Sequence, residues 1–340
     1  MILYIKLTTI FLSFFLYYNT NLLIDKSDEI ELSDSISSVF QQSTSSFHTS
    51  GDTFYFTSGN TVTSYDLTTG NQKFVNDLTG EGPFELENLY DISSDNRSKN
   101  FSVLSYNGNV LDFDKNGDPN HEFRIESVRN KSILQVDTNY VVVNESPASD
   151  HYASVFDQNG NIVRNLDISQ ENENILLSAF KNGGTLQTVQ DEIWITSSYG
   201  SEVIVFDSST FELKNRIKLD IPDFLSTPAE EDLPVYFQDM DKMNDFFQSN
   251  SIILNVYPFG EDFLIEVMHM HDQFRKDLVL MDQNLNYRCH STMPSSLDGV
   301  EDPTTVFAKN ELIYFYREEI HHDDNDRIRK FLSGYSVSCD

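Results

Sequence analysis

Positive charge and cysteine are the two scarcest features of this chain. Only 23 of its 340 residues are Lys or Arg against 54 Asp or Glu, and the formal net charge is −31. So negative a surface repels phosphate backbones, which argues against nucleic acid as a partner and disfavours an anionic lipid surface. The same charge favours either a cationic partner or high solubility.

The two cysteines, Cys289 and Cys339, set a narrow limit on metal and redox chemistry. No paired-cysteine zinc motif can be formed from them, and the chain also lacks a nucleophile elbow, a Walker loop and a Gly-rich dinucleotide loop. In an oxidising compartment the two thiols could form a disulfide, and two unpaired cysteines are the alternative. The sequence therefore assigns no catalytic, metal-ligating or binding residue.

Long apolar runs are also missing, apart from one at the N-terminus. Met1–Lys6 carries one basic side chain, Leu7–Tyr18 is almost wholly apolar or hydroxylic, and polar and acidic residues follow. This order is typical of a secretory signal, and the run is short for a membrane span. We expect residues 1–24 to be a signal peptide, or an uncleaved N-terminal anchor, and residues 25–340 to be one domain. No nearby cysteine could carry a lipoprotein anchor, and the expected location is the periplasm or the cell exterior.

An internal repeat is the main positive signal in the sequence. A strand-forming run, a polar turn, a second run that ends near an Asp, and a Gly/Asn turn recur six times. The second runs are Val62–Asp66, Val110–Asp114, Tyr152–Asp157, Val203–Asp207, Asp277–Asp282 and Arg329–Val337. The aspartates that end the first five are 48, 43, 50 and 75 residues apart. A unit of about 40 to 50 residues with four short strands is the size of one β-propeller blade.

The repeat predicts an all-β fold, a six-bladed propeller of four-stranded antiparallel blades. The recurrent Asn-Gly and Gly-Asn pairs supply the positive φ angles of tight hairpins. Each repeated Asp is expected to bond local backbone amides, as in Asx turns. The last blade lacks residues for its outer strand, whereas Glu29–Leu32 is a spare strand candidate. We therefore expect residues near Ile30 to pair with the last blade and close the ring.

The longest spacing indicates an insertion in blade five, at about residues 222–250. Apolar residues at Val235, Phe237, Met240, Met243, Phe246 and Phe247 have helical spacing. This spacing predicts that the insertion contains a short helix. It is either a lid or docking element over the ring, or an excursion that packs against its own blade.

The segment Thr79-Gly80-Glu81-Gly82-Pro83-Phe84-Glu85 carries a resemblance to a known group of proteins. It resembles the Gly-x-Gly-Pro-x-Glu phrase at a blade junction of bacterial cell-envelope six-bladed propellers, which are similar to NHL-repeat propellers. Many members have Gly where Phe84 stands here, and many are lipoproteins with an N-terminal cysteine that this chain lacks. The resemblance implies a fold and a compartment. It implies no activity, because most of these families are uncharacterised.

Two patterns are candidates for divalent metal. Asp112, Asp114, Asn116, Gly117 and Asp118 resemble the first half of a calcium loop, but position twelve holds Phe123 rather than Glu. The alternative is an ordinary hairpin turn. His269 and His271 are spaced to share one face of a strand next to Asp272, and a metal would need a third ligand such as His290, His321 or His322. The expected cofactor is none, with calcium or another divalent ion as the alternative.

Three functions are compatible with this fold. The favoured one is an exported non-catalytic binding or scaffold propeller that uses one face for a protein, peptide or glycan. The second is a hydrolase or lyase with a metal or acid/base site in the central channel. The third is a structural subunit of an envelope complex, which would expose a large apolar patch. Three or more His, Asp or Glu from different blades at the axis would favour the enzyme, and apolar or hydroxyl groups there would favour the binder.

Overall fold

The computed structural model describes most of the chain after residue 21. The described residues are 22–33, 46–80, 84–86, 88–94, 100–125, 130–144, 153–168, 186–196, 200–225, 241–242, 245, 248–294, 296–297, 300–301, 304–321 and 327–339.

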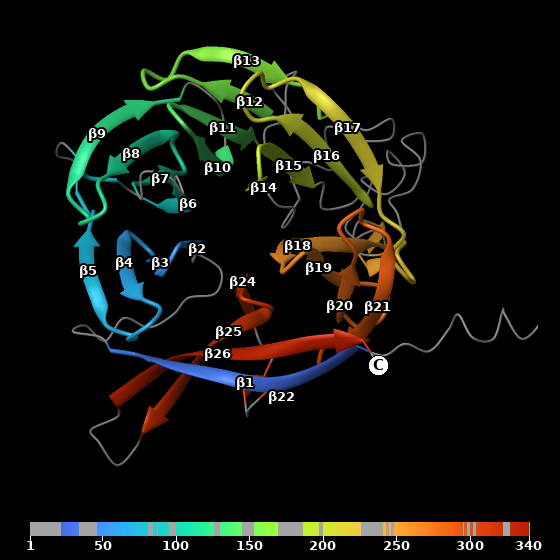
Figure 1. Cartoon of the computed structure of the whole chain (residues 1–340). Helices are drawn as coiled ribbons and strands as arrows, with labels where there is room; N and C mark the ends of the chain where they lie inside the picture. Colours follow the sequence, from blue (N-terminus) through green and yellow to red (C-terminus); the bar gives the residue numbers. More distant parts are fainter. Residues whose placement is uncertain are drawn as a thin grey trace, which may run out of the picture.

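Six four-stranded antiparallel sheets form a ring, so the predicted six-bladed propeller is confirmed (Figure 1). We number the blades along the chain. Blade 1 consists of β2 (Phe47–Ser50), β3 (Thr53–Ser58), β4 (Thr61–Asp66) and β5 (Gln72–Asp77). Blade 2 consists of β6 (Leu89–Ser94), β7 (Phe101–Ser105), β8 (Asn109–Phe113) and β9 (Pro119–Arg124). Blade 3 consists of β10 (Asn130–Val136), β11 (Asn139–Asn144), β12 (Ala153–Phe156) and β13 (Ile162–Leu166).

Blades 4 to 6 complete the ring. Blade 4 consists of β14 (Leu186–Val189), β15 (Glu192–Thr196), β16 (Glu202–Asp207) and β17 (Leu213–Lys218). Blade 5 consists of β18 (Ser251–Phe259), β19 (Asp262–His269), β20 (Arg275–Met281) and β21 (Tyr287–Thr292). Blade 6 consists of β24 (Thr304–Lys309), β25 (Leu312–His321), β26 (Arg327–Cys339) and β1 (Leu22–Leu32). Within blades 1 to 5 the chain runs from the innermost to the outermost strand. A small hairpin of β22 (Ser296–Leu297) and β23 (Val300–Glu301) precedes blade 6.

The outermost strand of blade 6 comes from the other end of the chain, as the sequence predicted. β1 pairs antiparallel with β26, and Ile30 lies opposite Leu332. Ser33, next to β1, forms a parallel bridge with Asn71 of blade 1 and donates its N–H to the Gly70 carbonyl. One strand therefore completes blade 6 and contacts blade 1, which closes the ring.

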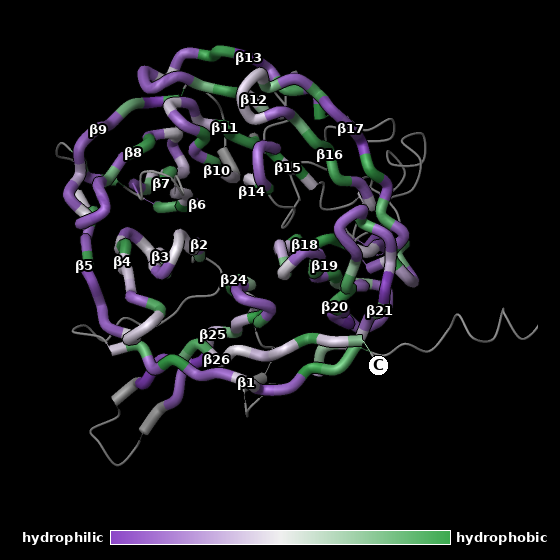
Figure 2. The backbone as a smooth tube through the Cα atoms, in the orientation of Figure 1, coloured by the Kyte–Doolittle hydropathy of each residue, from purple (hydrophilic) through white to green (hydrophobic). Residues whose placement is uncertain are grey.

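Apolar side chains between neighbouring blades form the core. Among the described residues there are six buried clusters, and each spans one of the six blade junctions. At the junction of blades 6 and 1, for example, Leu32 packs with Phe54 and Phe307. The outermost strands face solvent on one side, and Figure 2 shows β5 and β9 as largely hydrophilic. The middle strands are buried on both faces instead, and every residue of β7 is buried, for example.

The five repeated aspartates have the structural role that their position predicted. Asp66, Asp114, Asp157, Asp207 and Asp282 each accept hydrogen bonds from backbone N–H groups two to four residues further on. Bonds from the N–H groups of Asp118 and Asn116 lower the pKa of Asp114 below its ordinary value.

The insertion between β17 and β18 falls mainly on residues outside the described part. The predicted helical stripe over 235–247 cannot be followed there, although Asp241 and Lys242 have helical backbone. Every named element of the described residues is a strand. Within the same residues no helix is long and apolar enough to cross a membrane.

Candidate functional site

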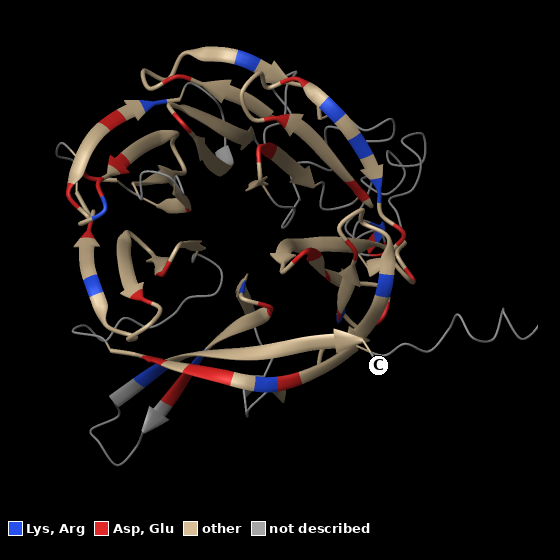
Figure 3. Ribbon diagram, in the orientation of Figure 1, with Lys and Arg blue, Asp and Glu red and all other residues tan. Residues whose placement is uncertain are grey.

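The first strand of each blade lines a central cavity of about 480 Å³. Residues of β2, β6, β10, β14, β18 and β24 contribute to its wall, so all six blades take part. The lining consists mostly of hydroxyl and aliphatic side chains, with His48 and Asp91 as its ionisable groups apart from the Tyr257 phenol. Among the described residues of the lining there is no Lys or Arg. Figure 3 shows many Lys and Arg on outermost strands such as β5, β13 and β17.

Polar side chains of the channel wall join blades 1, 2 and 3. The Asp91 carboxylate of blade 2 accepts a bond from the Ser46 hydroxyl at 2.8 Å and from the Ile133 N–H of blade 3 at 2.9 Å. Ser93 of blade 2 accepts the Gln135 N–H at 3.1 Å. These side chains satisfy N–H groups on the free edges of the inner strands. Asp91 therefore has a structural role in this part of the channel.

His48 links blade 1 to blade 2 and has a defined tautomer. Its Nε2 accepts the backbone N–H of Ser94 at 3.1 Å and lies 2.7 Å from the Ser94 hydroxyl. A backbone N–H can only donate, so the neutral ring carries its proton on Nδ1. Burial lowers the pKa of His48 to about 4, so the ring is neutral near pH 7.

A buried carboxyl lies behind the channel wall in blade 5. Glu266 is 3% exposed and accepts a bond from the Asn255 amide at 3.0 Å. Burial raises the pKa of Glu266, although the Asn255 bond and the positive charge of Lys276 oppose the shift. Burial and the negative charge of Glu266 also raise the pKa of Tyr257, a residue of the channel wall. Glu266 thus holds its proton more tightly than an exposed Glu would.

Two exposed aromatic rings, Tyr90 and Tyr106, lie next to each other in blade 2. Tyr90 occupies the β-bulge at the start of β6, one residue before the channel-lining Asp91. Its ring centroid lies 5.9 Å from that of Tyr106, in the turn between β7 and β8, and the two side chains are 37% and 43% exposed. Among the described residues, the other large exposed apolar side chains are spread over the outer strands and turns, for example Ile162 and Phe274.

The candidate calcium ligands do not converge on one point. The Asp112 carboxylate is buried between blades 2 and 3, where it accepts the Ser102 and Tyr140 hydroxyls, each at 2.6 Å. Burial raises the pKa of Asp112 despite these bonds. Asp114, two residues on, points into its own turn instead. β8 ends at Phe113, so Asp114 belongs to the following turn and its carboxylate is separated from that of Asp112 on the strand.

One histidine of the predicted pair, His269, takes part in a buried polar row across blade 5. β19 ends at His269, so His271 lies in the following turn rather than on the strand as predicted. His269 Nδ1 lies 2.9 Å from the Ser251 hydroxyl, and Nε2 lies 3.3 Å from the Asp277 carboxylate. Burial raises the pKa of Asp277, but bonds from His269 and Thr292 and the Arg275 charge outweigh it and leave the pKa below its ordinary value.

The row resembles a Ser-His-acid constellation, but Ser251 and His269 are 0% exposed and Asp277 is 1% exposed. The other predicted ligands do not join it. His290 bonds to Tyr287 at 2.8 Å, and the His321 side chain and His322 lie outside the described residues. No group of three or more His, Cys, Asp or Glu with metal-binding geometry occurs in the described part of the chain. His269 therefore stabilises blade 5 and is not accessible to a substrate.

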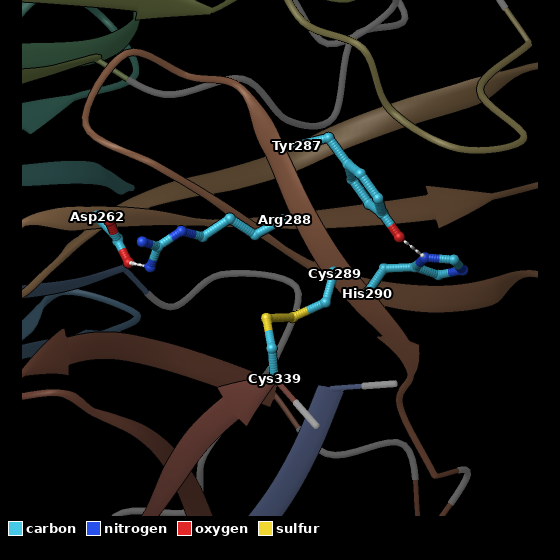
Figure 4. The surroundings of a disulfide bond; sticks show 6 residues. All are labelled: Asp262, Tyr287, Arg288, Cys289, His290 and Cys339. Atoms are coloured by element: carbon cyan, nitrogen blue, oxygen red, sulfur yellow. Dashed lines mark hydrogen bonds and ion pairs between the residues drawn. A yellow bond between two sulfur atoms is a disulfide. The ribbon is translucent and has the colours of Figure 1, made fainter. Parts of the chain in front are cut away.

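Cys289 and Cys339 form a disulfide, which settles the alternative that the sequence left open. The bond joins β21 of blade 5 to the last residue of β26 in blade 6. Figure 4 shows its surroundings, with Arg288 paired to Asp262 and the Tyr287–His290 bond nearby.

Part of the Thr79–Glu85 phrase lies outside the described residues, at Glu81, Gly82 and Pro83. Gly80 has φ +154°, and a Cβ there would lie 2.0 Å from the Glu85 carboxylate. The Asp77 carboxylate accepts the Thr79 N–H at 3.0 Å. The described part of the phrase thus forms a tight junction between blades 1 and 2.

The chain is similar in fold to solved propellers of Bacteroides. One is a Bacteroides fragilis protein whose name proposes that it is exported, with a TM-score of 0.68 and 14% identity over 93% of this chain and 95% of that one. Another is a member of the DUF4221 family from Bacteroides vulgatus, with a TM-score of 0.63 and 8% identity over 94% and 99%. No known protein family and no curated protein matches the sequence. At these identities the likeness establishes the propeller fold, and the NHL-like relationship stays a prediction.

Sequence reasoning missed the channel residues His48, Asp91 and Gln187. The inner strands are short and have mixed polarity, so they carry no repeat signal of their own. A survey of polar residues in the first strand of each repeat was the one signal that could have found them.

Proposed function

We propose that this chain is an exported, non-catalytic binding propeller of the bacterial envelope, whose ligand binds at the central channel. The observation that carries the proposal is the channel lining, which is hydroxyl and aliphatic in character and whose ionisable side chains His48 and Asp91 are already engaged between blades. A pocket of this size with a few fixed polar groups is typical of a small-molecule site.

Two further observations support binding rather than catalysis. Asp91 and Glu266 come from blades 2 and 5, on opposite sides of a six-membered ring, and each is held by bonds to protein groups. Proton transfer in catalysis needs an acid or base within hydrogen-bond reach of a bound substrate. The proposed export is supported by the signal-like N-terminal segment and by the name of the Bacteroides fragilis protein.

A channel-filling variant tests this function. Thr188 lines the channel and has no hydrogen bond through its side chain in the structure, so Thr188→Trp fills the cavity without removing a bond. Thr68→Trp, in an exposed turn of blade 1, is the matched control. The wild type and both variants are screened by thermal shift against neutral and charged sugars, short peptides and amino acids. They are also assayed for turnover of p-nitrophenyl esters, phosphates and glycosides.

The proposal expects a compound that raises Tm for the wild type and for Thr68→Trp but not for Thr188→Trp, with no turnover. Turnover that is lost only in Thr188→Trp would establish the channel enzyme instead. A compound that stabilises all three proteins equally would place binding outside the channel.

A further inference from the structure

The channel contains hydrogen-bond donors without acceptors. Gln187 of blade 4 lines the channel, and its side-chain nitrogen is buried beside it without a hydrogen-bond partner. An unsatisfied buried donor is costly and is rare in folded proteins. On the opposite side of the ring, in blade 1, the His48 Nδ1–H has no acceptor among the described residues, because the bonds of this ring all use Nε2.

These donors restrict the charge of a ligand. The positive group of a cation has no acceptor for the N–H groups of His48 and Gln187, so it would leave both donors unsatisfied. An anion would meet the Asp91 carboxylate and a protein of net charge −31, and the part of the channel wall that the structure describes offers it no Lys or Arg. The ligand that fits is therefore uncharged and rich in acceptor oxygens.

The rest of the channel narrows the class further. Ser132 and Thr188 are wall hydroxyls that can donate or accept, and Ile92 and Val256 provide apolar surface. Tyr90, one residue before the channel-lining Asp91, and its neighbour Tyr106 are exposed rings tilted 45° to each other, and the C–H face of a sugar ring can pack on either of them. A volume of about 480 Å³ lies within the range of small-ligand sites.

We infer that the channel binds a small neutral saccharide, with sugar oxygens accepting hydrogen bonds from His48 and Gln187 and a ring face against Tyr106. This inference rests on the proposed binding function and specifies its ligand class. A neutral sugar supplies many acceptor oxygens without charge, whereas a free peptide carries charged termini.

The test is isothermal titration of the full chain with sugars that share a ring but differ in charge. The neutral probes are D-glucose, D-galactose, D-mannose, N-acetyl-D-glucosamine, maltose and lactose. The charged probes are D-glucuronate and D-glucosamine. At least one neutral sugar is expected to bind, with the charged probes about tenfold weaker or more.

Three variants examine the named contacts. His48→Gln keeps an acceptor for the Ser94 N–H but removes the Nδ1 donor, Gln187→Met removes the buried amide, and Tyr106→Ala removes the aromatic surface. Each is expected to weaken the neutral sugar about tenfold. Gln187→Met should also keep or raise the Tm of the ligand-free protein, since it removes an unsatisfied group. The matched controls Gln158→Met and Phe274→Ala, both at exposed turns, should bind as the wild type does.

The inference is overturned if none of the neutral sugars binds, if a charged probe binds as tightly, or if the three variants bind like the controls. The screen with Thr188→Trp separates these failures. If a different compound is still lost on filling the channel, the binding function stands and the ligand class is wrong. If no compound depends on the channel, both fail.

Discussion

At the scale of single residues, buried polar groups in this propeller are held by specific partners, and those partners decide what each group can do. Asp91, Asp112 and Asp277 all lie on strands, but each is bonded to hydroxyl, amide or imidazole groups of the blades. Carboxylates that could be mistaken for catalytic groups in the sequence therefore stabilise blades and blade junctions.

The buried row of blade 5 is expected to be important for stability. His269→Ala leaves the Asp277 carboxylate and Ser251 hydroxyl without the imidazole, and should lower the free energy of unfolding by about 3 kcal/mol. Urea unfolding measures the change. His271→Ala, at an exposed turn position two residues away, should stay within about 0.5 kcal/mol of the wild type. Equal losses in the two variants would contradict a special role for His269.

The raised pKa of Glu266 predicts how the stability of the folded protein changes with pH. Its pKa in the folded protein is raised above 4.5 by burial, so the folded state binds this proton more tightly than the unfolded state. The contribution to stability is therefore full below pH 4.5 and is lost as pH rises through the folded pKa.

Glu266→Gln removes this proton and should flatten that decline. The measurement is unfolding free energy against pH for the wild type and the variant, and the difference between them isolates Glu266 from the turn aspartates. These aspartates act in the opposite direction, because their lowered pKa values give stability that is lost as pH falls below about 3.8. A difference that does not change with pH above 4.5 would refute the role of Glu266.

At the scale of elements, β1 is the strand on which the ring depends. It pairs with β26 from Leu22 to Leu32 and places the Glu31 carbonyl against the Gly70 turn of blade 1. Leu22 is 3% exposed and lies opposite Cys339, so the paired strand is already formed at Leu22.

Two glycines give a matched test of this closure. Gly70 and Gly59 have φ +69° and +59°, but a Cβ on Gly70 would lie 2.0 Å from the Glu31 carbonyl oxygen, whereas a Cβ on Gly59 meets nothing within 4 Å. Both alanine variants incur a similar backbone strain. Gly70→Ala should cost about 1 to 3 kcal/mol more than Gly59→Ala, because the turn or β1 must shift. Thermal unfolding compares them, and equal stability would show that β1 does not pack closely on this turn.

At the scale of the whole molecule, the disulfide and the β1–β26 pairing meet at the same end of β26. Cys339 lies opposite Leu22 in the β1–β26 pairing and is bonded to Cys289 of blade 5. The crosslink therefore fixes the end of the strand to which β1 adds.

Removal of the crosslink should weaken the fold as one unit. Cys289 and Cys339 are 50 residues apart, and the chain-entropy estimate for a loop of that length is about 4 kcal/mol. The double variant Cys289→Ala/Cys339→Ala, or the wild type in reductant, should unfold at a lower temperature in one transition. Thiol alkylation serves as the control for complete reduction. An unchanged Tm with both thiols alkylated would contradict this contribution.

The sequence alone was sufficient for the six blades, their order and the closure near Ile30. These features depend on short-range chemistry. Asp and Gly/Asn turns specify hairpins, and short runs rich in apolar residues specify buried strands, so a repeat of these signals specifies a repeated sheet. Which side chains meet across blades depends on long-range packing. Only the tertiary structure placed His48 against Ser94, buried Asp112 away from Asp114, paired Cys289 with Cys339 and brought six inner strands around one channel. Residues of different blades lie far apart in the chain, and the ring must close before the channel wall exists.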